Sequence, residues 1–101
     1  MRMIMHIFFP VEVFNASVKD GSVGAKMQRI LAHQKPEAAY FTEYHGQRAG
    51  ILIVDVKEAS QIPEFAEPWF LLFQAKVELH PAMTPQDLAS SGLDALGREW
   101  H

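Results

Sequence analysis

The order in which strand-like and helix-like segments follow one another most constrains the fold of this chain. Residues 3–9 form a short apolar run that ends at Pro10, which is typical of a strand buried on both faces. After a short helical turn, residues 22–34 repeat apolar side chains at helical spacing. We expect that helix to end before Pro36, because the residue before a proline avoids the α region.

A hairpin is predicted next. Residues 38–45 and 49–56 are rich in aromatic and β-branched side chains, and Gly46 lies in the connection between them. Residues 75–81 alternate apolar and polar side chains, so we expect another strand, with one polar face.

Between these strands lies a second helix. Ser60 is its predicted N-cap and Pro63 lies in its first turn, where a missing N–H is tolerated. Pro68 cannot donate a hydrogen bond to Glu64, so we expect a bend or a restart there. Apolar residues repeat along this helix with the spacing i, i+3, i+4, i+7, i+10, i+11, and this stripe predicts that Trp69 lies in the core. The members of the stripe are Ile62, Phe65, Ala66, Trp69, Leu72 and Phe73.

One further helix is expected over residues 84–100. Thr84 is the predicted N-cap, Pro85 the first helical residue and Asp87 the acid of a capping box. The predicted apolar face of this helix is Ala89, Leu93, Leu96 and Trp100.

The resulting order is β-α-β-β-α-β followed by a helix. It predicts an α+β ferredoxin-like sandwich with an extra C-terminal helix, in a single domain over residues 1–101. Two helices should cover one sheet face. The first and third strands should lie in the centre, parallel to each other, with the fourth strand beside the first.

Composition excludes several classes of partner. The net charge is −3 and basic residues are scattered, which argues against nucleic acid. There is no cysteine, so thiolate chemistry and disulfides are excluded, and a cytoplasmic location is compatible. No apolar run approaches the ~20 residues of a membrane span, and we expect no membrane partner and no signal peptide.

Both faces of the central strands are largely apolar. A domain of this size rarely leaves several hundred Å² of contiguous apolar surface in water. We therefore predict a homodimer through the sheet face that the helices leave open. The alternative is a weakly associating monomer whose open sheet binds a ligand. By alternation, the first strand carries Ile4, His6 and Phe8 on one face and Met3, Met5, Ile7 and Phe9 on the other. The third strand carries Ile51 and Ile53 on one face and Leu52, Val54 and Val56 on the other.

The element order is similar to that of the dimeric α/β-barrel group of ferredoxin-like proteins. Three stretches resemble a set of small uncharacterised bacterial proteins: "KPEAAYFTE" at 35–43, "SQIPEFAEPWF" at 60–70 and "MTPQDL…GLDALGREW" at 83–100. The resemblance spans nearly the whole chain and implies a fold and a dimer. The broader group includes cofactor-free monooxygenases, lactone isomerases, haem-dependent members and stress-response proteins, so it implies only a menu of functions.

His6 is the first candidate for chemistry. It lies in the middle of an apolar strand, and the neighbouring fourth strand carries Glu78 and His80 on its polar face. An imidazole beside a carboxylate can form an acid–base or orienting pair. The alternative is a buried histidine satisfied by one hydrogen bond, or a histidine that packs in the dimer interface. Glu78 and His80 should stand about 7 Å apart along their strand, and without a compact ligand motif we predict no metal site.

A second cluster lies on the predicted second strand. Tyr40, Thr42 and Tyr44 should point to one face, and Phe41 and Glu43 to the other. Glu43 in a partly apolar cavity could act as a base, although a glutamate on an edge strand more often discourages pairing. His45, beside Gly46, is predicted to be a solvated turn residue.

Three functions remain open from the sequence. The first is a dimeric protein that binds a small, largely apolar molecule between sheet and helices or between sheets, without a cofactor. The second is a cofactor-free monooxygenase-like or isomerase-like enzyme in which His6 is the general base. The third is a structural or interaction protein with no ligand. The predicted ligand-binding residues are His6, Phe8, Tyr40, Glu43, Glu78 and His80.

Overall fold

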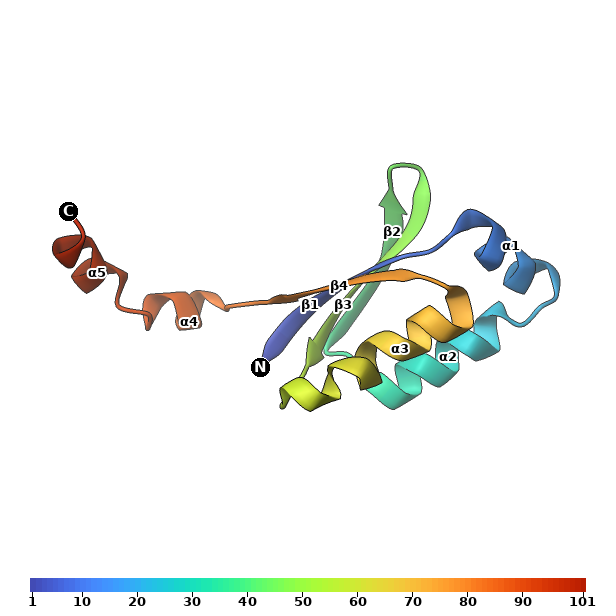
Figure 1. The fold of residues 1–101 in the computed structure, drawn as a ribbon, viewed down its shortest axis with the longest axis horizontal. Coiled ribbons are helices and arrows are strands. Elements are labelled where there is room, and N and C mark those ends of the chain that lie inside the picture. The colour runs from blue at the N-terminus through green and yellow to red at the C-terminus, as the bar shows by residue number, and fades with distance from the viewer.

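The computed structural model describes all 101 residues and has a four-stranded sheet with two long helices on one face (Figure 1). Each predicted strand is present. The elements are β1 (Arg2–Phe8), α1 (Val11–Lys19), α2 (Val23–Gln34), β2 (Ala38–Tyr44), β3 (Gln47–Asp55), a 3-10 turn η1 (Ala59–Gln61), α3 (Ile62–Phe73), β4 (Lys76–Pro81), α4 (Pro85–Ala89) and α5 (Leu93–Glu99).

The strand order is β2-β3-β1-β4, and every neighbouring pair is antiparallel. The predicted order is therefore confirmed, but the parallel orientation predicted for the first and third strands is wrong. The crossover through α1 and α2 makes β1 parallel to β2, and the hairpin then reverses β3. The arrangement is an α+β fold compatible with the ferredoxin-like pattern.

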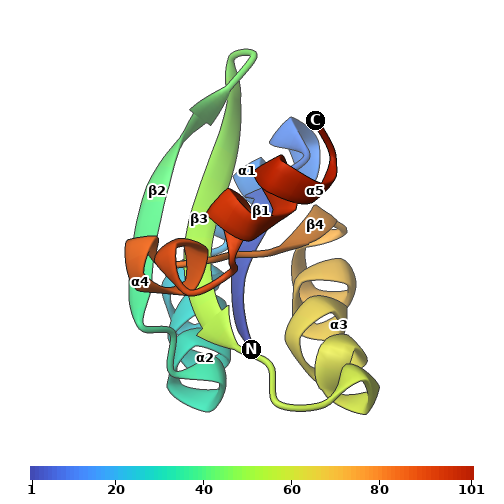
Figure 2. The same cartoon turned by 90° about the vertical axis from the view of Figure 1, so that its left-hand side faces the viewer.

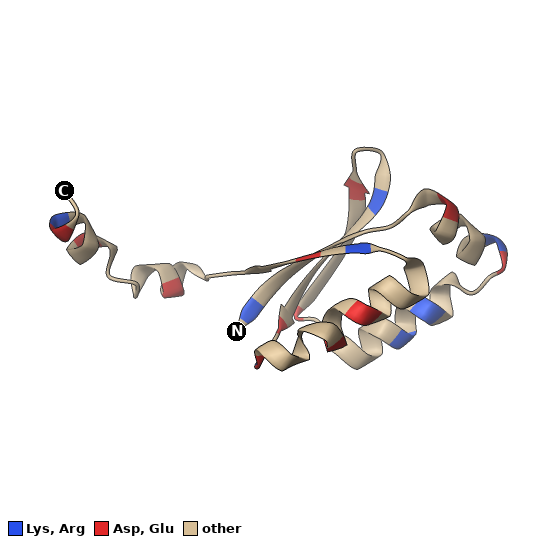
Figure 3. Ribbon diagram, viewed as in Figure 1, with Lys and Arg blue, Asp and Glu red and all other residues tan.

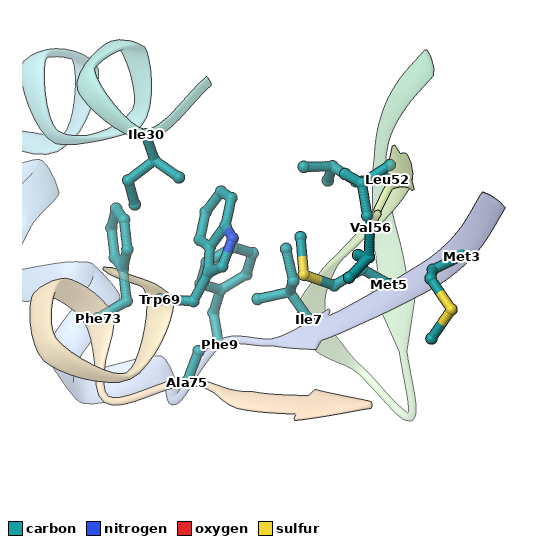
Figure 4. Packing of buried hydrophobic residues seen from close by; sticks show 11 residues of the cluster. Met3, Met5, Ile7, Phe9, Ile30, Leu52, Val56, Trp69, Phe73 and Ala75 are labelled. Atoms are coloured by element: carbon teal, nitrogen blue, oxygen red, sulfur yellow. The ribbon is translucent and has the colours of Figure 1, made fainter. Parts of the chain in front are cut away.

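The hydrophobic core fills the layer between the sheet and the helices. Trp69, Phe9 and Phe73 are fully buried, and the ring of Phe9 meets the other two edge to face at centroid distances of 5.9 and 5.3 Å (Figure 4). Met5 and Leu52, opposite each other on β1 and β3, lie beneath them and are also fully buried. The core position predicted for Trp69 is confirmed.

Two details of α3 differ from the prediction. The turn η1 occupies residues 59–61, so α3 begins at Ile62 rather than after an N-cap at Ser60. Pro68 lies inside α3, which continues through it to Phe73 without a restart.

The single helix predicted for residues 84–100 is two short helices. Thr84 and Asp87 form the predicted capping box of α4, but α4 ends at Ala89. Gly92 then adopts a left-handed conformation (φ 79°), which ends one helix and redirects the chain into α5. Figures 1 and 2 show both helices projecting beyond the end of the sheet, off the layer formed by α2 and α3. No helix combines the length and apolar character needed to cross a bilayer.

Candidate functional site

The candidate site is the sheet face that no helix covers, which we call the open face. Its central row is Ile4, His6 and Phe8 on β1. In register, these residues stand opposite Ile53, Ile51 and Ala49 on β3 and opposite His80, Glu78 and Lys76 on β4. Alternation along each strand thus places the apolar residues of β1 and β3 beside the polar face of β4.

The centre of the open face is apolar and only partly buried. Ile4, Phe8, Ile51 and Ile53 all retain contact with solvent, whereas their neighbours on the helix side are buried. Within one chain, β1 is therefore buried on one face and not on both, because α2 and α3 cover only one side of the sheet. The prediction that the first strand is buried on both faces is therefore not met within a single chain.

His6 lies in the middle of this face without a hydrogen-bond partner from the chain. Its ring centroid is 6.1 Å from that of Phe8 and 6.0 Å from that of His80, both in edge-to-face geometry. The side chain is partly buried, and no hydrogen bond joins the ring to another residue. Within one chain, His6 is therefore neither fully buried nor satisfied by a hydrogen bond, and packing in a dimer interface stays a prediction.

Glu78 and His80 meet at their tips. The Nε2 of His80 lies 3.5 Å from the Oε1 of Glu78, so a protonated His80 would form an ion pair there. This is closer than the separation of about 7 Å expected from their spacing along β4. Both side chains come from β4 (Lys76–Pro81), point toward each other and are about half exposed.

A hollow of about 430 Å³ lies at the end of the open face beside Phe8. Its aromatic wall is formed by Phe8 and Tyr44, whose ring centroids are 5.0 Å apart. Lys76 and Glu78 supply one cation and one carboxylate at its margin. Gln47 also lines it and donates from Nε2 to the carbonyl of Phe9 at 2.7 Å.

Five of the six predicted ligand-binding residues lie on the open face: His6, Phe8, Tyr40, Glu78 and His80. Glu43 does not, because it has the opposite parity on β2 and stands opposite Arg48. Its carboxylate accepts a hydrogen bond from the amide of Gly46 at 2.9 Å, within the hairpin turn. Glu43 thus belongs to the edge strand and its turn, which agrees with the edge-strand alternative.

Five residues of the hollow were not among the predicted site residues: Pro10, Tyr44, Gln47, Gln74 and Lys76. Strand parity could have indicated two of them, since Tyr44 has the parity of Tyr40 and Lys76 has that of Glu78. His45 has φ 51° and is exposed in the turn, as predicted.

A second hollow, of about 470 Å³, lies between α2 and α3 on the opposite side of the molecule. Arg29 and His33 line it from α2, and Glu64 and Glu67 line it from α3. Figure 3 shows this pairing of a basic helix with an acidic one. His33 lies 3.5 Å from Glu64, so part of this charge is already paired. None of the predicted site residues lies here.

No group of three or more histidine, aspartate or glutamate side chains is arranged to hold a metal ion. The chain matches no protein-family model, and no curated protein is significantly similar to it.

Proposed function

We propose that two copies of this chain pair through their open faces as a dimeric α/β barrel, and that the paired faces bind a small, largely apolar molecule. The partly buried centre of the face supports the pairing, since a contiguous apolar patch on a small domain marks an interaction site. A two-fold copy of the same surface is the simplest cover for it.

The observation that carries the binding function is the unpaired ring of His6. A second sheet over the open face would bury this ring further, and a buried polar group needs a hydrogen-bond partner. The chain itself provides none to His6. A bound molecule with a polar group would provide one, and His80 and Glu78 would lie beside that group.

The hollow beside Phe8 sets the class of molecule. Its volume of about 430 Å³ falls in the range of small-molecule sites. Aromatic rings and polar side chains both line it, and Phe8 and Glu78 connect it to the row of His6, which does not itself line the hollow. Phe8 and Tyr44 offer ring faces for stacking, and Lys76 offers one cation. A planar or aromatic molecule with a carbonyl or carboxylate group fits these residues best.

The contact between His80 and Glu78 favours a second candidate function, a cofactor-free enzyme. A carboxylate within 3.5 Å of an imidazole can orient it for proton transfer, and His6 would be the nearby general base. A binding protein and an enzyme would use the same residues here, so the two functions are distinguished by whether the bound molecule is converted to a product. The cysteine-free composition fits a cytoplasmic protein, and this location is part of the proposal.

A thermal-shift screen of small carbonyl and carboxylate compounds tests the binding function. A ligand that binds only the native state raises Tm, and the shift grows with concentration. His6→Ala should abolish the shift, whereas the matched control His33→Ala, in the hollow between the helices, should retain it. An unchanged shift in His6→Ala would remove His6 from the site. A dimer with no ligand in a broad screen would favour the interaction role.

A further inference from the structure

Residues 82–101 form an arm that leaves the body of the molecule beside the start of β1 (Figure 1). The amide of Ala82 donates to the carbonyl of Arg2 at 3.0 Å, and all later hydrogen bonds of the arm stay within it. The radius of gyration is 17.0 Å, against about 13 Å for a compact domain of this length. The arm is thus not part of the compact body of its own chain.

The arm carries an apolar face with nothing against it. Leu93, Leu96 and Trp100 follow the spacing i, i+3, i+7 on one side of α5 and are 56%, 45% and 78% exposed. Leu88 adds to this face from α4 and is 45% exposed. The two helices have five and seven residues, and isolated helices shorter than about 12 residues are marginal in water. The arm therefore needs a packing surface in order to stay helical.

Strand β2 offers the matching surface. It is an edge strand with large apolar side chains on both faces, since Tyr40, Phe41 and Tyr44 are all more than half exposed. Its one charged side chain, Glu43, is held by the hairpin turn. The hollow between α2 and α3 also has an apolar lining, which includes Ile30, Leu71 and Leu72. It suits the arm less well because Arg29, His33, Glu64 and Glu67 lie around it and would lose water against an uncharged face.

We propose that the arm of each copy packs this leucine and tryptophan face against the β2 edge of a second copy. The arm extends from β4, which lies at the opposite edge of the sheet from β2. A two-fold pair makes every such contact twice. Trp100 alone can remove about 150–250 Å² from water, which is a substantial share of the ~800 Å² that a standard interface buries on each partner. The arm contact rests on the dimer of the proposed function but not on its ligand.

Sedimentation of the full chain tests the contact. Leu96→Ser should weaken the dimer Kd at least tenfold, the effect of exposing one large buried apolar side chain. Ala95→Ser lies on the other side of α5, is equally solvent-exposed, and should leave Kd unchanged. Equal Kd values for the two variants would overturn the proposal. If both variants still dimerise and Ile51→Asp does not, the copies pair through their open faces and the arm does not contribute to the interface.

Cross-linking tests the receiving surface and the exchange between copies. The chain has no cysteine, so single cysteines can be introduced cleanly. Ala95→Cys protein is mixed with Thr42→Cys protein, which places one thiol on the arm and the other on β2 of a different copy. A short bifunctional thiol reagent should join them more efficiently than Ala95→Cys with the control Glu12→Cys on α1. Equal yields would overturn β2 as the receiving surface.

Fluorescence distinguishes an arm that packs on a second copy, which we call exchange, from an arm that folds back onto its own chain. Trp69 is fully buried, so a change in tryptophan emission on dilution reports Trp100. Exchange predicts that Trp100 becomes exposed as the dimer dissociates. An emission spectrum that stays constant through dissociation would overturn exchange, because Trp100 would then be either always covered by its own chain or never covered.

Discussion

Gln34 and Trp69 form a buried polar contact between α2 and α3. The indole Nε1 of Trp69 donates to the Oε1 of Gln34 at 3.2 Å. The Nε2 of Gln34 in turn donates to the carbonyl of Phe65 at 2.8 Å and approaches that of Glu64 at 3.5 Å. Glu64 is the residue to which Pro68 cannot donate. The amide of Gln34 therefore accepts from the indole of Trp69 and also donates to the backbone carbonyls of α3 where Pro68 provides no N–H.

Removal of this amide should destabilise the fold. Gln34→Leu leaves the Nε1 of Trp69 buried without a partner, and an unsatisfied buried group costs about 1–3 kcal/mol. Urea unfolding measures the loss. Gln28→Leu, an exposed position on the same helix, should change stability by less than about 0.5 kcal/mol. A loss of the same size in both variants would show that the polar contact adds nothing.

Pro68 and Gln34 should be energetically coupled. In Pro68→Ala, the new amide at position 68 can donate to the carbonyl of Glu64, so the fold depends less on Gln34. Gln34→Leu should then cost about 0.5–1.5 kcal/mol less in the Pro68→Ala background, close to the net value of one hydrogen bond. A double-mutant cycle by urea unfolding measures the difference. Strict additivity would mean that Gln34 acts only through Trp69.

Strand alternation predicted more of the candidate site than of the wider fold. It placed His6 and Phe8 on one face, with Glu78 and His80 on the neighbouring strand, because side-chain direction in a strand depends only on parity. It left open which face of the sheet Tyr40 occupies, since that depends on the register between β2 and β3. It could not predict the 3.5 Å approach of His80 to Glu78, which depends on side-chain rotamers.

The errors have local causes. Gly92 was the sequence signal for the break between α4 and α5. It was overlooked because Ala89, Leu93, Leu96 and Trp100 keep helical spacing across the break. The strand directions were also mistaken, although the element order alone fixes them once the crossover and the hairpin are combined. The position of the arm was beyond prediction, since periodicity does not say what a helix packs against.

Helix α4 should respond to acid. The backbone amide of Thr84 donates to the carboxylate of Asp87 at 3.0 Å and holds the pKa of Asp87 below its usual value. Because the folded-state pKa is lowered, the stabilisation is complete above the unfolded value of about 3.9 and is lost as pH falls through the folded one. Proton exchange at the Thr84 amide, followed by NMR, should accelerate in that window. Asp87→Ala should show fast exchange at every pH.

The open face should control association. Ile51→Asp places a carboxylate at the partly buried centre of the face, opposite His6, where a second sheet would bury it. We expect this variant to sediment as a monomer of about 11.4 kDa at micromolar concentration, and the unsubstituted chain to sediment as a dimer. Val18→Asp, a half-exposed position on α1, is the control and should leave the dimer intact. Circular dichroism at low protein concentration should show that both variants are folded, because Ile51 is only partly buried in the single chain and Val18 is half exposed. If Ile51→Asp were still a dimer, the interface would have to lie elsewhere than on the open face. If all three proteins were monomers, the open face would have no second copy over it and His6 would stay exposed to solvent.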